Sequence, residues 1–89
     1  MLPLKWLPEA WEEYLDIQSQ NKVLLKKVNK LIKEIQRNGY NTQEGSFEML
    51  KHRLTGCASV KANKKDRIVF TIEDETVVII QCGGHYNDK

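Results

Sequence analysis

Apolar residues alternate most regularly near the end of the chain, in two runs rich in β-branched side chains. The runs cover residues 67–72 and 76–82, and the acidic residues Glu73 to Glu75 lie between them. This pattern predicts a β-hairpin with a three-residue loop. Such a loop places Phe70 opposite Val78, so one apolar face is expected, formed by Ile68, Phe70, Ile72, Val78 and Ile80.

Two segments before this hairpin have helical periodicity. In residues 22–38, apolar side chains recur every three or four positions, which predicts an amphipathic helix with Leu24, Val28, Leu31 and Ile35 on its buried face. Asn21 is expected to cap the start of this helix, and Gly39 to end it. An earlier helix is expected to begin at Pro8 and to turn four side chains toward the core: Trp11, Tyr14, Leu15 and Gln18.

The other segments predict short strands. Residues 2–7 and 57–61 have strand-like patterns, whereas residues 47–54 fit either a strand or a helical turn. A five-residue loop before Arg67 pairs Lys61 with Arg67, and so Ser59 with Val69. A four-residue loop would bury the charge of Lys61 in the apolar face, which is unfavourable, so the five-residue loop is preferred.

These elements predict one α+β domain over residues 1–89. Its two N-terminal helices are antiparallel and pack on one face of a twisted, mainly antiparallel sheet of four to five strands. The opposite face is expected to carry Ser59, Lys61 and Arg67. The glycine pair at 83–84 allows a bend that brings His85 and Tyr86 toward Arg67; a frayed tail is the alternative.

The net charge of +2 conceals an uneven distribution. Residues 8–18 hold four acidic residues and no basic one, whereas residues 21–37 and 51–67 each hold six basic residues and one acidic residue. Concentrated positive charge favours a polyanion or an acidic partner. For residues 21–37, simple solvation of a helix face is an equally good explanation.

Several classes of protein are disfavoured by the sequence. It has no apolar run long enough to span a membrane and no secretion signal, so a cytoplasmic protein is expected. Cys57 and Cys82 are expected on opposite faces of the sheet as free thiols. The chain has neither metal-type ligand spacing nor a phosphate-binding glycine loop, so no metal or cofactor is expected.

The candidate chemistry is phosphate binding and RNA cleavage. Two adjacent cations, Lys61 and Arg67, would bind a phosphate between them. Cleavage through the 2′-hydroxyl needs a base and an acid, roles that Glu48 and His85 could fill, and Lys51 could add a further cation. Alternatively, Glu48 is an exposed carboxylate that only forms a salt bridge.

The chain resembles the YoeB/Txe branch of the RelE/ParE superfamily of bacterial toxins from Trp6 to Tyr86. The matching segments are Trp11 to Tyr14, Lys26 to Ile35, Glu48 to His52, Leu54 to Gly56, Asp66 to Phe70, and His85-Tyr86. The resemblance implies a toxin that cuts mRNA on the ribosome and is held inactive by a YefM/Phd-type antitoxin. A homodimer is compatible with it.

The resemblance also implies roles for individual residues. It makes Glu48 the general base, Arg67 the phosphate-binding arginine, His85 the general acid and Tyr86 the terminal aromatic that holds the substrate. Lys51 matches a basic residue near the phosphate. Ser59 and Lys61, on the same side of the sheet, complete the expected substrate-binding set.

The sequence departs from this family where two arginines usually follow the serine after the Leu-x-Gly turn. Here these positions are Val60 and Lys61, and lysine lacks the two-pronged hydrogen bonding of arginine. Two alternatives therefore stay open: a toxin that acts on DNA gyrase, as ParE toxins do, and a degenerate toxin that only binds its antitoxin.

Overall fold

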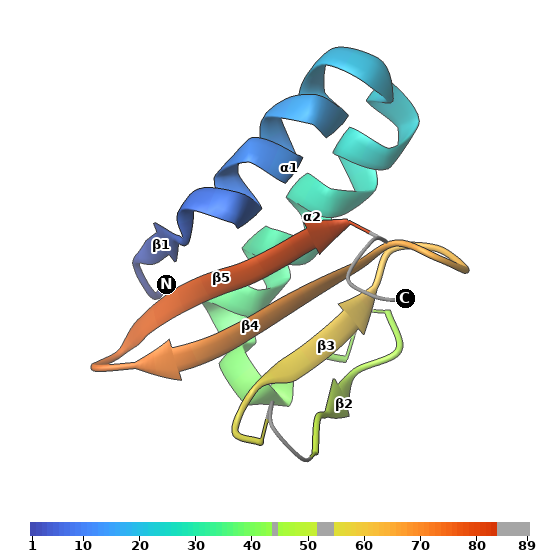
Figure 1. Ribbon diagram of the computed structural model, residues 1–89. Coiled ribbons are helices and arrows are strands. Elements are labelled where there is room, and N and C mark those ends of the chain that lie inside the picture. The colour runs from blue at the N-terminus through green and yellow to red at the C-terminus, as the bar shows by residue number, and fades with distance from the viewer. Residues whose placement is uncertain (44, 52–54, 84–89) are drawn as a thin grey trace.

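The protein, seen here as a computed structural model, is described over residues 1–43, 45–51 and 55–83. Two helices cover one face of a five-stranded sheet with the strand order β1-β5-β4-β3-β2 (Figure 1). This is the expected α+β architecture. The strands are β1 Leu4–Trp6, β2 Glu48–Met49, β3 Ala58–Lys61, β4 Arg67–Glu73 and β5 Thr76–Gly83, and the helices are α1 Pro8–Gln20 and α2 Lys22–Asn38.

The joint between the helices is the single residue Asn21, which ends α1 and begins α2. Its backbone N–H donates to Ile17 O at 2.9 Å, and its side-chain Oδ1 accepts from the backbone N–H of Leu24 at 3.1 Å. The predicted N-cap is therefore confirmed. Gly39 ends α2 with a φ of 56°, a left-handed angle that glycine adopts without strain, and starts the short 3₁₀ helix η1 Gly39–Asn41.

The predicted buried face of α2 is confirmed, whereas that of α1 is confirmed only for Tyr14, which packs partly buried against the core. The buried residues of α1 are Ala10 and Ile17, two turns apart. Trp11 and Leu15 keep 43% and 37% of their surface exposed, and Gln18 is also exposed. The prediction followed the large side chains, whereas the fully buried residue of α1 is the small Ala10.

The predicted three-residue loop of the hairpin is also wrong. Glu73 continues β4 and pairs with Thr76, which leaves only Asp74 and Glu75 in the turn, with φ angles of 52° and 59°. Two successive left-handed residues are typical of the tight turn that matches strand twist. Phe70 therefore pairs with Ile79 instead of Val78.

Shifting the register by one residue exchanges the faces of a strand. Val77 and Ile79 join the core beside Phe70, whereas Val78 pairs with Thr71 on the opposite face. Ile80, also expected in the core, is only partly buried. An irregularity between Val69 and Phe70 then shifts the pairing once more, so that Val69 pairs with Gln81 and Arg67 with Gly83.

The edge strands complete the sheet. Strand β1 runs parallel to β5, with Lys5 opposite Val78, and β2 runs antiparallel to β3. The ambiguous segment 47–54 thus includes a short strand, while residues 52–54 lie outside the described part. Within the described residues, neither helix is long and apolar enough to cross a membrane.

Candidate functional site

The candidate site is built on the sheet face that the helices leave uncovered. Lys61 pairs with Arg67 and Ser59 with Val69, so the predicted five-residue loop and register are confirmed. The loop is held by Asn63, whose Oδ1 accepts from the backbone N–H groups of Lys65 and Asp66 at 2.9 and 2.7 Å. This local turn sets which β3 side chains share a face with Arg67.

Strand β2 adds the carboxylate. Glu48 pairs with Ser59, and directly opposed residues of antiparallel strands point to the same face. Glu48, Ser59, Lys61 and Arg67 therefore share one face across three strands. Glu48 and Lys61 are exposed, and Arg67 is partly buried.

Strand spacing gives the size of this arrangement. Glu48 lies two strands and two residues away from Arg67, which corresponds to roughly 12 Å between their Cα atoms. The Glu48 and Arg67 side chains can extend toward each other across this gap, and Lys61 flanks it. The register thus places one carboxylate and two cations on the same face of neighbouring strands.

The remaining candidate residues are only partly placed. Lys51 is exposed just after β2. His85 and Tyr86 lie outside the described residues. The last described residue of β5 is Gly83, which pairs with Arg67 at one end of the site.

Ser59 and Val60 differ from their neighbours in exposure. Ser59 keeps only 1% of its surface exposed, so it lies beneath the site rather than on open surface. Val60 is fully buried and belongs to the core. The valine that replaces an arginine of the resembling family therefore points away from the face that carries Lys61.

A carboxylate of α1 supports the end of β5. Glu13 Oε1 accepts a hydrogen bond from the backbone N–H of Cys82 at 2.8 Å.

Burial of Cys82, together with the nearby charges of Glu13 and Asp66, raises the pKa of its thiol to about 12. Burial and, to a smaller extent, Glu73 also raise the pKa of Cys57. Both cysteines are free thiols, as predicted.

Gln81 is a polar feature that the sequence pattern did not single out. It pairs with Val69 on the site face, and its Oε1 is buried without a hydrogen-bond partner among the described residues. A buried acceptor without a donor is unfavourable. An amide within an otherwise apolar strand is the sequence signal that could have identified it.

An aromatic groove was also missed, because Trp11 and Tyr14 were expected in the core. Trp6 lies 4.8 Å from Tyr14 and 5.5 Å from Trp11, measured between ring centroids. These rings line a groove of about 470 Å³, together with Leu4, Asn29, Ile32, Lys33 and Gln36.

Within the described residues, no group of three or more acidic, histidine or cysteine side chains is arranged to hold a metal ion.

Known proteins are similar to this chain in sequence and fold. Residues 6–86 match the family model described as a YoeB-like toxin of bacterial type II toxin-antitoxin systems. Toxin YoeB of Escherichia coli K12 is 35% identical over 85 residues, which cover 96% of this chain and 100% of that protein.

Two solved structures from Staphylococcus aureus are also similar. A YoeB-YefM complex is 40% identical with a TM-score of 0.87, covering 97% of this chain and 99% of the matched chain. A YoeB dimer is 39% identical with a TM-score of 0.85, covering 96% of this chain and 98% of the matched chain. The family match over residues 6–86 and the 35% identity to a full-length relative show that this chain belongs to the YoeB-like toxins of bacterial type II toxin-antitoxin systems.

Proposed function

We propose that this chain is a ribosome-dependent, metal-independent endoribonuclease that cuts mRNA in the bacterial cytoplasm. The reaction is attack of a ribose 2′-hydroxyl on the adjacent phosphate, which expels the 5′-oxygen of the next nucleotide and leaves a cyclic phosphate. The observation that carries this proposal is the strand register that puts Glu48, Lys61 and Arg67 on one face. Membership of the YoeB-like toxins supports it.

Each residue has a distinct role in this mechanism. Glu48 takes the proton from the 2′-hydroxyl, and His85 returns a proton to the departing 5′-oxygen. Arg67 and Lys61 stabilise the negative charge that builds on the phosphate, because cations placed there interact more strongly with the transition state than with the substrate.

The other predicted residues assist. Lys51 adds positive charge beside Glu48, and Tyr86 holds the neighbouring nucleotide. Buried Ser59 supports Glu48 from the adjacent strand. Arginine would grip the phosphate with two parallel hydrogen bonds, whereas Lys61 interacts as a point charge. We therefore expect Lys61→Arg to raise the cleavage rate.

The test is cleavage of a translated message on purified ribosomes. Glu48→Gln, Arg67→Ala and His85→Ala should each lower the rate by on the order of 10² or more. Glu73→Gln, which neutralises an exposed carboxylate at the far end of β4, is the control for Glu48→Gln and should leave the rate unchanged. Incubating the toxin with a chelator such as EDTA before ribosomes are added should also leave the cleavage rate unchanged.

A second readout separates the alternatives. If the chain inhibits gyrase supercoiling and leaves the message intact, the nuclease proposal is wrong. Cleavage that is unaffected in all three site variants would instead refute the assigned roles.

We also propose that a YefM-type antitoxin inhibits this chain and that two copies associate through the aromatic groove. The related YoeB proteins of Staphylococcus aureus form a YefM complex and a dimer. Trp11, with 43% of its surface exposed, presents a large apolar ring to solvent. Exposed aromatics rimmed by polar residues are typical of protein interfaces.

Sedimentation equilibrium tests this association. Trp11→Ala should shift the protein from dimer toward monomer at micromolar concentration. Val23→Ala is the control, because Val23 has 77% of its surface exposed on α2 and does not line the groove. Equal dimer fractions in both variants would contradict the assignment of this surface.

A further inference from the structure

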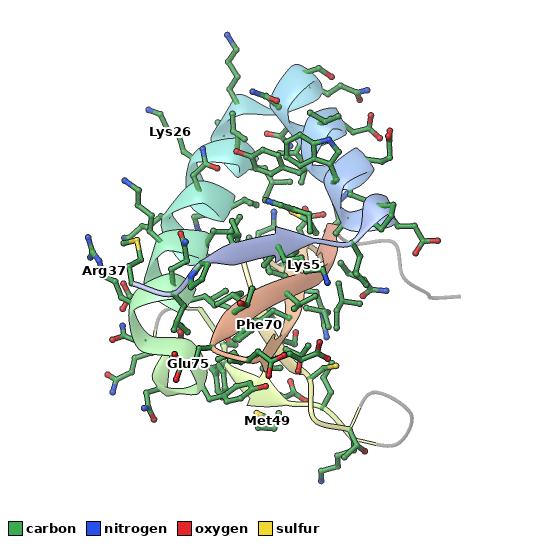
Figure 2. All side chains as sticks on the ribbon, turned by 90° about the vertical axis from the view of Figure 1, so that its left-hand side faces the viewer. Lys5, Lys26, Arg37, Met49, Phe70 and Glu75 are labelled. Atoms are coloured by element: carbon green, nitrogen blue, oxygen red, sulfur yellow. The ribbon has the colours of Figure 1, made fainter. Side chains whose placement is uncertain are left out.

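One face of α2 is a continuous row of positive charge. Its five basic residues are all exposed: Lys22, Lys26, Lys30, Lys33 and Arg37. With about 100° between successive helical residues, they fall within an arc of about 80°, opposite the buried face. Figure 2 shows Lys26 and Arg37 projecting from α2 on the same side of the molecule. We call these five residues the basic row.

The basic row is poorly balanced by acidic groups of its own helix. Glu34 is the only acidic residue of α2, and its Oε2 accepts a hydrogen bond from Asn38 Nδ2. Like charges one turn apart on a helix destabilise it. A row of this kind is therefore better explained by a multivalent anion that binds along it than by solvation alone.

The positive charge continues from the basic row toward the candidate site. A cavity of about 140 Å³ lies where α2 meets the end of β3, lined by Lys27, Lys30, Leu31, Gly45, Lys61 and Ala62. Lys61 in turn pairs with Arg67. One basic surface thus extends from the outer side of α2 to the proposed phosphate-binding residues.

The composition of α2 indicates what kind of anion fits. Proteins that bind single-stranded RNA stack its bases on aromatic rings, and α2 has no aromatic residue. Protein interfaces have an apolar, aromatic-rich centre, whereas Val23 is the only large apolar side chain that α2 exposes along its described length. Of the basic row, only Lys33 also lines the aromatic groove assigned to dimerisation. Base-paired RNA, by contrast, is recognised mainly by its shape and by its phosphates and 2′-hydroxyls.

We propose that the basic row binds the phosphate backbone of base-paired RNA, and so docks the protein on folded ribosomal RNA while the message occupies the site beside Arg67. The row spans about 22 Å from Lys22 to Arg37, which is long enough to meet several successive phosphates. This inference rests on the proposed ribosome-dependent function, because it supplies the contact through which the ribosome would be required.

The test compares two double variants. Lys26→Gln with Arg37→Gln removes two charges from the basic row, and glutamine keeps a helix propensity similar to theirs. Lys5→Gln with Lys64→Gln removes two exposed lysines from outside α2. Both are made in a Glu48→Gln background so that RNA stays intact, and circular dichroism checks that they fold.

Binding is measured by fluorescence anisotropy against a labelled RNA hairpin, and by co-sedimentation with purified ribosomes, over a series of salt concentrations. The basic-row variant should bind both about tenfold or more weakly. Its slope of log affinity against log salt should fall by about 0.9 for each lost phosphate contact, hence by about 1.8. The control variant should match the parent protein.

Three results would overturn the inference. One is equal weakening in both variants, which indicates a general charge effect. In the second, the basic-row variant binds only a single-stranded RNA oligonucleotide more weakly and binds the hairpin normally. In the third, it binds only the purified antitoxin more weakly. Cleavage by the protein with Glu48 intact is assayed separately. If that protein does not cut message but still binds hairpin RNA through the basic row, the nuclease proposal fails and the docking surface stands.

Discussion

The close approach of Gly45 to β3 links the fold to the candidate site. A Cβ atom on Gly45 would lie 2.5 Å from Val60 Cγ1 and 2.7 Å from the backbone oxygen of Lys61. Contacts this short do not occur, and neither neighbour moves easily, because Val60 is fully buried and the oxygen belongs to the sheet. The segment that leads to Glu48 can therefore lie against β3 only because residue 45 has no side chain.

The cost of Gly45→Ala can be separated into two parts. The φ of Gly45 is 66°, and a left-handed angle costs alanine about 1–2 kcal/mol. Forcing a methyl group into a packed site adds about 1–3 kcal/mol. Together these predict a loss of about 2–5 kcal/mol in the free energy of unfolding, and displacement of the segment that positions Glu48.

Gly56→Ala is the matched control. Gly56 also has a positive φ, 94°, but a Cβ there would meet nothing within 4 Å. This variant should lose only the backbone part, about 1–2 kcal/mol. Urea unfolding followed by tryptophan fluorescence measures both values, and message cleavage should fall further in Gly45→Ala. If the two variants lose equal stability, the steric reasoning is wrong.

Three further predictions concern stability. Asn21→Ala should lower the free energy of unfolding by about 1 kcal/mol in urea titrations, because the Leu24 N–H loses its acceptor, whereas Asn21→Ser should lose less. Tyr40→Phe should cost about 1–3 kcal/mol by the same assay, since Tyr40 Oη accepts from the Ile72 N–H at 2.9 Å; an unchanged midpoint would contradict this. Because folding raises the pKa of Cys82 from 9.0 to about 12, its stabilising contribution is complete below pH 9 and is lost as pH rises toward 12. Between these values, unfolding free energy should fall more steeply with pH in the parent protein than in Cys82→Ala, and parallel curves would refute this.

Local patterns in the sequence were sufficient for the helices and for one loop. The apolar repeat of α2, the Asn21 cap and Gly39 identify α2 without reference to any distant residue, because capping and amphipathicity act within a few turns. The pairing of Lys61 with Arg67 followed from the cost of burying a lysine. This pairing alone puts Lys61 and Arg67 on one face.

Other features depended on contacts between distant parts of the chain. The two-residue turn at Asp74 and Glu75 has no glycine or asparagine to mark it, so the acidic run was read as a longer loop. Val78 was then assigned to the wrong face, since a shift of one residue exchanges the two faces of a strand.

The side of α1 that faces the core was likewise decided by tertiary packing. The sequence by itself determined the elements, their order and the chemistry available to the candidate site, because these depend on local propensity and residue type. The tertiary structure alone decided that Trp11 faces solvent, that Val60 lies in the core and that Glu48 stands opposite Ser59. These facts depend on how neighbouring strands and helices pack, and that packing balances the whole core rather than any short segment.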